Sequence, residues 1–465
     1  MQGSSLLHPF TTCPSAFPSL PVSAGELLHS SSLAGELQVR PPAVLLGCGG
    51  RRARLHLLPL PGGHGRHLSP TWMMAAAEFL SWSDLPPELL GLVLKCLPSL
   101  ADRVRLRAVC HPWRSNARLQ TLPPPLPWLT LLDGTFLSIP DGEIIKLAVP
   151  DDARCCGSID NWLFLMQVHG GCSLMNPFSK ATLDLPNLTT FWGQAGSMDS
   201  DINPLFYKVV VPSPLDSSPE SLVAVLILDN DNRSTVCICQ PPVATDLFRR
   251  RGMGHCRYLY DIAFFNGKLY GVPFGDELVI FEIGYDFASK PKISSTECII
   301  NAWDVLPDLP QSLSREKVYM LRKYLVECCG RLLMVGRFIH NDGPFSTSLS
   351  FEHHRTVAFD VFEADLSTNP GQWRRVSKLG GQALFVGQHS SKSFAVELYN
   401  GVQEDCIYFI CDYPRKVHAA DPLRDSGVYN LRNGMITPLL PQTTTLPQHH
   451  DGQWRPTWFF PADSI

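Results

Sequence analysis

Between residues 82 and 122 the hydrophobic positions recur every three to four residues, the spacing typical of short helices. One apolar face of a first helix would consist of Leu89, Leu92, Val93, Cys96 and Leu97. Ser83 or Asp84 can cap this helix, and a proline suits its first position. Pro98 would end it, because proline cannot continue a helix.

Two further helices follow from the same pattern. The second is predicted to start at Ser99–Asp102 and carries three arginines among apolar residues. The third starts near Pro112, and Pro123–Pro125 ends the helical pattern. Three short helices cannot bury much of a core, so part of their apolar surface is expected to face a partner. A helical cap on the following domain explains the pattern equally well.

From Trp128 onward the pattern changes to short β-type runs separated by Gly, Pro, Asp and Asn. Phe264–Val272 predicts a hairpin with Asn266-Gly267 at the turn. Related phrases occur at 159–165, 326–336 and 405–410. Their equivalent residues Leu163, Leu269, Leu332 and Ile407 are spaced by 106, 63 and 75 residues. If the first interval holds two units, the unit is about 50 residues, as in kelch-like propeller blades. A β-sandwich pair or an irregular all-β domain is the alternative.

Composition narrows the choice of function. The chain has 465 residues and a formal net charge of -4, which gives no basic footprint for nucleic acid or anionic membrane. No apolar run reaches the roughly 18–20 residues of a membrane span. The 15 cysteines are odd in number and form no Cys-x-x-Cys, so we interpret them as buried or half-buried thiols of a reducing compartment.

Residues 1–78 differ from the rest, being rich in Ser, Leu, Pro and Gly. We interpret them as a disordered extension, because little there could form a continuous apolar face. Their arginine-bearing, acid-poor composition also fits an organelle-targeting peptide, although prolines interrupt any helix. A third hypothesis is that translation starts at Met73 or Met74 and that residues 1–72 are dispensable.

The sequence shows no recognisable motif for catalysis or for binding a metal or cofactor. The chain contains no Gly-x-Ser-x-Gly, Walker loop or His-Glu-x-x-His sequence. Asp229–Asn232 resembles a calcium loop but lacks its later ligands, so a polar hairpin turn is predicted. The pairs His353-His354 and His449-His450 are expected in exposed loops, and Arg249–Arg251 in a solvated loop. We therefore expect no enzyme activity, no cofactor and no metal.

The helical segment resembles an F-box of the plant type. The match rests on Leu-Pro-x-Glu-Leu-Leu at residues 85–90 and Val-Cys-x-x-Trp-Arg at residues 109–114. The resemblance implies binding to a Skp-type adaptor and, through it, to a cullin ubiquitin-ligase core. The contact residues that it implies are Leu85, Pro86, Leu89, Leu92, Leu97, Val109, Cys110 and Trp113. His111 stands where the family commonly has arginine and is expected on the solvent side.

The β-rich segment is similar to a second family, the plant F-box-associated domain of unknown function 295. That family is regarded as a β-propeller that recruits the substrate. The similarity rests on the segments Leu379–Gly387, Ser393–Val396, Cys406–Phe409 and Gly427–Leu431. It also rests on Asn176-Pro177-Phe178 followed by Leu183, Leu185 and Pro186.

The expected organisation is a disordered extension (1–78), an F-box (79–122) and a propeller (125–460). The expected fold is a small all-α F-box of three short helices followed by a large all-β, kelch-like propeller of six or seven blades. The expected role is a non-catalytic substrate-recognition subunit of a Skp–cullin–F-box E3 ubiquitin ligase, cytoplasmic or nuclear, with an unknown protein target.

Two alternatives stay open. One is a propeller that acts as a binding or scaffold protein outside ligases, for example in an organelle, with a vestigial F-box. The other is a propeller enzyme, which would need acids, bases or metal ligands converging at the central channel.

Overall fold

The computed structural model describes residues 82–461 with interruptions, the longest being 187–205, 242–257, 302–312, 342–353, 413–422 and 441–455. The described residues belong to one compact unit, Glu78–Ile465. The predicted N-terminal extension and the hypothetical start at Met73 lie outside the described residues. Within the described part of the chain, no helix has the length and apolarity to cross a bilayer.

The first described elements are a 3-10 turn and the three predicted short helices. They are η2 (Trp82–Asp84), α1 (Pro87–Lys95), α2 (Leu100–Arg107) and α3 (His111–Arg118). Leu90, Leu94, Leu106 and Ala117 form their shared core. The prediction of three helices is confirmed, and so is the proline at the first position of α1.

The predicted cap of α1 is wrong. Ser83 and Asp84 lie in η2, and the cap position is occupied by Pro86, which makes no side-chain cap hydrogen bond. The chain therefore enters α1 through two consecutive prolines, Pro86 and Pro87. The fixed φ of proline prepares this entry without a polar cap.

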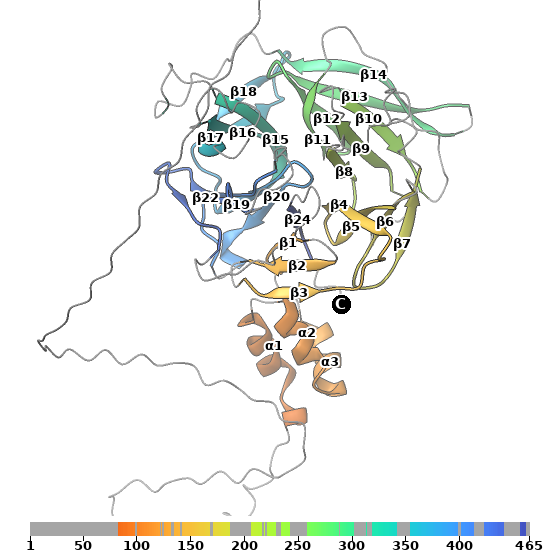
Figure 1. Ribbon diagram of the computed structural model, residues 1–465, viewed down its shortest axis with the longest axis vertical. Helices are drawn as coiled ribbons and strands as arrows, with labels where there is room; N and C mark the ends of the chain where they lie inside the picture. The colour runs from red at the N-terminus through yellow and green to blue at the C-terminus, as the bar shows by residue number, and fades with distance from the viewer. Residues whose placement is uncertain are drawn as a thin grey trace, which may run out of the picture. The chain divides into compact units, whose positions relative to one another are not determined.

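The strands of the described residues form six sheets arranged in a ring, a six-bladed β-propeller (Figure 1). Blade 1 contains β4 (Ala153–Ile159), β5 (Trp162–Gln167), β6 (Cys172–Met175) and β7 (Thr182–Leu185). Blade 2 contains β8 (Phe206–Val210), β9 (Val223–Leu228) and β10 (Ser234–Cys239). Blade 3 contains β11 (Leu259–Phe265), β12 (Lys268–Pro273), β13 (Leu278–Tyr285) and β14 (Pro291–Ile300).

Blade 4 contains β15 (Tyr319–Cys328), β16 (Arg331–Asn341), β17 (His354–Asp365) and β18 (Gln372–Arg375). Blade 5 contains β19 (Gln382–Val386), β20 (Lys392–Ala395), β21 (Cys406–Phe409), β22 (Gly427–Asn430) and β23 (Ile436–Thr437), with the 3-10 turn η7 (Val396–Leu398) after β20. Blade 6 joins β24 (Thr457–Phe459) to β1 (Trp128–Thr130), β2 (Thr135–Ser138) and β3 (Ile144–Lys146). The all-β prediction and the lower of the two predicted blade numbers are confirmed.

Blade 6 closes the ring by combining the two ends of the propeller sequence. In the strand order β24-β1-β2-β3, the C-terminal strand pairs antiparallel with the first propeller strand. Leu129 faces Trp458 in this register, and Trp128 faces Phe459. The backbone hydrogen bonds of this pair hold the first and last strands of the propeller together within one blade, without a covalent link.

The predicted two-residue hairpin turns are present in three of the four related phrases. Asn266 and Gly267 have φ of 48° and 74°, and Cys329 and Gly330 have φ of 50° and 73°. Positive φ at both central residues matches the right-handed twist of the flanking strands. At the third turn Ile159 faces Trp162, and Asp160 has φ of 47°.

The fourth phrase, at 405–410, is not a hairpin. β21 follows η7 rather than a partner strand, and it pairs in parallel with β19. The hairpin partner of β19 is β20, which lies on its other side. The chain must therefore cross back before β21 can join the sheet, and blade 5 has five strands.

Apolar clusters fill the spaces between neighbouring blades. Successive side chains of a strand point to opposite sides of its sheet, so each blade contributes to two clusters. For example, Phe164 of blade 1 packs in one cluster with Val225 of blade 2, while Leu226 packs with Leu269 of blade 3. The core is thus a ring of interfaces between sheets.

The buried charges of the propeller are also shared between blades. Lys208 of blade 2 pairs with Asp261 of blade 3 at 2.6 Å, and the Asp261 carboxylate accepts the backbone N–H of Leu325 in blade 4. Arg337 of blade 4 is fully buried and pairs with Asp412 and Asp425, which lie in the connection between β21 and β22 of blade 5.

The minor predictions have mixed outcomes. His354 was expected in an exposed loop, but it is buried at the start of β17, a strand that the histidine pair did not reveal. Cys237 and Cys239 share one sheet face, as their spacing predicts. Asp229–Asn232 joins two paired strands but, like His449-His450 and Arg249–Arg251, lies outside the described residues. Among the residues that the structure describes, no group of His, Cys, Asp or Glu could hold a metal.

Candidate adaptor-binding surface

Helix α1 is apolar on two opposite faces, and only one of them faces the helical core. Leu90 and Leu94 are fully buried in that core. On the other face Leu89, Leu92 and Val93 are 49%, 59% and 43% exposed. This is the apolar face that the sequence predicts, and it is turned toward solvent. A soluble helix that exposes several large apolar side chains is typical of a partner-binding surface.

The eight residues implied by the F-box resemblance divide into two groups. Four are exposed: Pro86, Leu89, Leu92 and Val109. The other four are half-buried: Leu85, Leu97, Cys110 and Trp113. We call the exposed surface around the first group, together with Val93, the α1 surface. His111 is exposed, as expected.

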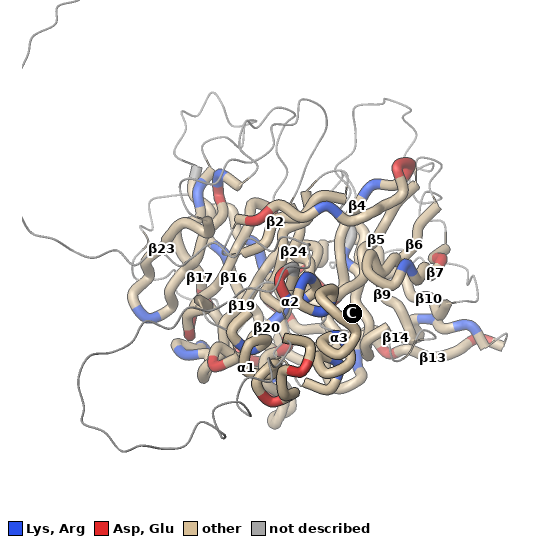
Figure 2. The backbone as a smooth tube through the Cα atoms, turned by 90° about the horizontal axis from the view of Figure 1, so that it is seen from below, with Lys and Arg blue, Asp and Glu red and all other residues tan. Residues whose placement is uncertain are grey.

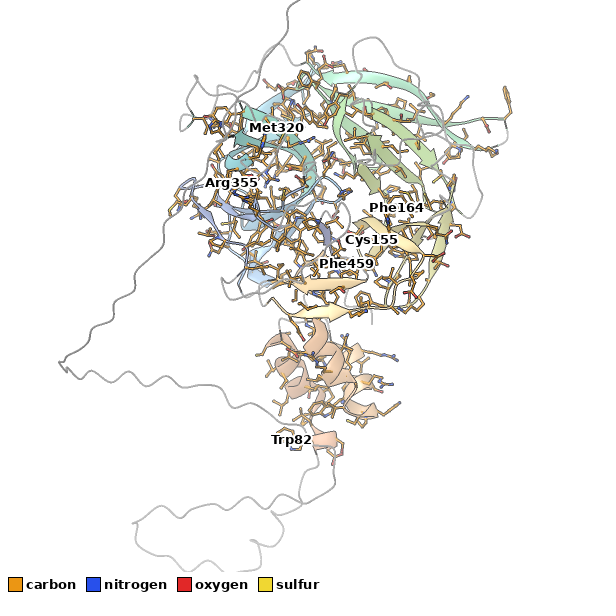
Figure 3. All side chains as sticks on the ribbon, viewed as in Figure 1. Trp82, Cys155, Phe164, Met320, Arg355 and Phe459 are labelled. Carbon is orange, nitrogen blue, oxygen red and sulfur yellow. The ribbon has the colours of Figure 1, made fainter. Side chains whose placement is uncertain are left out.

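The half-buried group also supports the helical module from within. Leu85, Leu97 and Trp113 pack against the core formed by Leu90 and its neighbours. The Trp113 indole donates a hydrogen bond to the carbonyl of Trp82, with 2.6 Å between the atoms. Trp82 itself lies at one end of the helical module (Figure 3). Substituting these residues would therefore change folding as well as any binding.

Further exposed apolar residues were not among the predicted contacts. Val93 follows Leu89 by four positions, so the helical spacing alone could have added it to the contacts. Trp82 and Leu119 are each 78% exposed, and Val104 of α2 is 38% exposed. The exposure of these three residues could not be predicted from helical spacing, because it depends on how the helices pack against each other.

Two of the three arginines of α2, Arg103 and Arg105, have different environments. Arg103 is buried, and its Nε donates to the carbonyl of Leu97 at 2.9 Å. Arg105 is exposed and pairs with Asp102 at 2.8 Å and with Glu143 at 2.7 Å. Hydrogen bonds to Glu143 and then to Asp102 raise the pKa of Arg105. Glu143 immediately precedes β3, so its ion pair with Arg105 connects α2 to blade 6.

Leu100 provides an apolar connection between α2 and blade 6. This first residue of α2 is only 1% exposed, and it belongs to a cluster with Trp128, Phe136 and Phe459. The aromatic rings of Phe136 and Phe459 have their centroids 5.2 Å apart. The Asn-Pro-Phe segment noted in the sequence contributes here too, because the ring centroids of Phe178 and Trp128 are 6.0 Å apart.

The charged residues do not form a one-signed surface. Lys and Arg positions are interspersed with Asp and Glu positions over the described helices and blades (Figure 2). This distribution agrees with the absence of a basic footprint in the sequence. Recognition by the α1 surface would therefore rest on apolar contact.

Comparisons with known proteins agree with this architecture. The chain matches the F-box-like family at residues 82–122 and the KIB1-4 beta-propeller family at residues 136–430. A solved structure of the fission yeast SREBP–SCAP binding domains is 7% identical, covers 53% of this chain and 74% of its own, and has a TM-score of 0.23, too low to support an argument.

Curated relatives from Arabidopsis thaliana match over most of their length. The putative F-box protein At2g04810 is 22% identical over 71% of this chain and 82% of its own. The F-box protein At2g17036 is 23% identical, over 76% and 89%. The F-box protein SKIP23 is 23% identical, over 77% and 91%. The chain therefore belongs to the KIB1-4 beta-propeller family and carries an F-box-like domain ahead of its propeller.

Proposed function

We propose that the chain is a substrate-recognition subunit of a Skp–cullin–F-box ubiquitin ligase. The α1 surface binds the Skp-type adaptor, and the propeller binds a protein target. The observation that carries the proposal is the outward apolar face of α1, with Leu89, Leu92 and Val93 exposed on an F-box-like domain. The chain needs no catalytic group for this role, because holding a target near the ligase core supplies the rate gain.

Two finer assignments belong to the same proposal. The propeller corresponds to the plant F-box-associated domain of unknown function 295, which is supported by the similarity of segments such as Gly427–Leu431. The protein acts in the cytoplasm or the nucleus, which is supported by cysteines that form no disulfide among the described residues, such as the buried Cys239 and Cys328. Imaging of a fluorescent fusion in plant cells would test the location, and fluorescence confined to an organelle would contradict it.

The test of the main proposal is capture of a Skp-type adaptor by the full chain. Leu92→Glu should reduce capture at least tenfold, because it places a charge on an apolar contact that the adaptor would desolvate. Phe287→Glu is the matched control, since Phe287 is also fully exposed but lies in blade 3, between β13 and β14.

Leu92 is a sharper site for this test than Leu85. Because Leu92 is 59% exposed, its substitution should leave the melting temperature nearly unchanged, whereas Leu85 packs against the helical core. Equal adaptor capture by the wild type and Leu92→Glu would refute the proposed surface. Absence of any adaptor from complexes of the wild-type chain would favour a vestigial F-box.

A further inference from the structure

All three buried Lys and Arg side chains of the described propeller are neutralised by carboxylates. The pairs are Lys208 with Asp261, Lys323 with Asp276, and Arg337 with Asp412 and Asp425. This pattern is expected, because a buried charge is costly unless it is paired.

Arg322 of β15 departs from this pattern. It is half-buried, and its Nη1 donates to the hydroxyl of Tyr258, 2.9 Å away. Its Nε is buried without a hydrogen-bond acceptor, and no carboxylate of the described residues pairs with it. A guanidinium keeps its charge at every physiological pH and offers a fork of donors. Arg322 therefore has a positive charge that no carboxylate of the described residues balances.

An aromatic wall lies beside Arg322. It consists of Tyr258, Tyr260 and Phe274 of blade 3. The rings of Tyr258 and Tyr260 meet edge to face at 4.9 Å, and those of Tyr260 and Phe274 stack at 6.1 Å. Phe274 is 71% exposed, so this wall is open to solvent.

The neighbouring Lys323 adds no net positive charge to this place, because a carboxylate neutralises it. The Lys323 ammonium lies 4.7 Å from the centre of the Tyr260 ring, but it forms an ion pair with Asp276. Within the described part of the chain, Arg322 is thus the charge beside the wall that has no carboxylate partner. A single carboxylate would balance it, whereas a phosphate dianion would bring excess negative charge close to Asp276.

We propose that Arg322 and the aromatic wall bind the carboxylate of an acidic side chain in the protein target, with the rings contacting the apolar neighbours of that residue. The inference deepens the proposed function, because it rests on the propeller being the half that binds the target. Arginine and a carboxylate form parallel charge-assisted hydrogen bonds, and exposed aromatic rings add contact area at low entropy cost.

The test uses the full chain and three pools of seven-residue peptides. The pools carry Glu, Gln or phosphoserine at the centre and random apolar or aromatic neighbours. The wild type should bind the Glu pool about tenfold more tightly than the Gln pool in fluorescence anisotropy. Arg322→Gln should bring this ratio close to one, and Lys268→Gln, which removes an exposed charge elsewhere on blade 3, should leave it unchanged.

Arg322→Lys separates binding from folding. It keeps the charge but loses the donor fork, so the ratio should fall part of the way while the melting temperature is retained. Equal binding of the Glu and Gln pools by the wild type would overturn the inference, and so would a ratio unaffected by both Arg322 variants. Tighter binding of the phosphoserine pool than the Glu pool would overturn the assignment to a carboxylate. Adaptor capture by the same preparations reports on the F-box separately.

Discussion

Trp458 in the last strand lies directly opposite Leu129 in the first strand of the propeller. The Trp458 indole also donates a hydrogen bond to the carbonyl of Val386 in blade 5, with 2.9 Å between the atoms. Its ring meets that of Phe385 edge to face at 5.1 Å. The Trp458 side chain therefore joins the closing blade, blade 6, to its neighbour blade 5.

Trp458→Ala should be among the most destabilising substitutions in the propeller. Trp458 is fully buried, so its loss removes a large apolar contact and leaves a cavity, at a cost of about 3–5 kcal/mol in the free energy of unfolding. Phe287→Ala is the control, because Phe287 is fully exposed and its loss should change stability by less than about 0.5 kcal/mol. Chemical denaturation followed by far-UV circular dichroism measures the stability of both variants. Similar midpoints for the two variants would contradict a closing role for Trp458.

Arg337→Met should destabilise the interface between blades 4 and 5. The substitution leaves Asp412 and Asp425 buried without their cation, and such a loss costs about 3–5 kcal/mol. Adding Asp412→Asn and Asp425→Asn to Arg337→Met should restore part of the stability at neutral pH. Failure of the triple variant to gain any stability would show that packing of the guanidinium, and not charge balance, is what matters.

The connection between α2 and blade 6 should depend on Leu100 more than on Arg105. Arg105 is 64% exposed in its side chain, and exposed ion pairs contribute only about 0.2–1 kcal/mol. Leu100 is buried among aromatic rings, so Leu100→Ala should cost about 2–5 kcal/mol. Hydrogen exchange of the α2 amides should accelerate in Leu100→Ala and hardly change in Arg105→Gln. Faster exchange in Arg105→Gln than in Leu100→Ala would show that the ion pair, and not the apolar contact, connects α2 to blade 6.

Buried thiols should be inert until the propeller unfolds. Burial raises the pKa of Cys239 to about 12, from 9.0 in its unperturbed state. Between these values the folded thiol keeps a proton that the unfolded thiol has lost, so this group makes the free energy of unfolding fall as the pH rises through that window. At pH 8, mass spectrometry should find iodoacetamide on Cys329, which is exposed at a hairpin turn, before it appears on Cys239. Equal rates at the two positions would contradict burial of Cys239.

The helical module could be predicted almost completely, because its signals are local. Proline positions and the spacing of Leu89 and Leu92 are enough to place α1. Sequence spacing could not show that this apolar face is exposed, because Leu90 and Leu94 form an equally apolar face on the other side. Which face packs inward depends on contacts with α2 and α3.

The propeller was predictable at turns whose residue types specify the backbone conformation. Asn266-Gly267 specifies a hairpin, since both residues accept positive φ. The count of blades was harder to predict, because blade 2 shows three described strands and blade 5 has five, so the repeat length varies. Partners such as Arg337 and Asp425 could not be paired from sequence, because their proximity exists only after the blades have packed together.

Closure by β24 also sets an order of events during synthesis. All three helices have left the ribosome once residue 118 has emerged, whereas the ring lacks its closing strand until residue 459 has emerged. Chains fold from the N-terminus as they are made. An adaptor can therefore meet a finished F-box on a nascent chain whose target-binding half is still an open arc of blades.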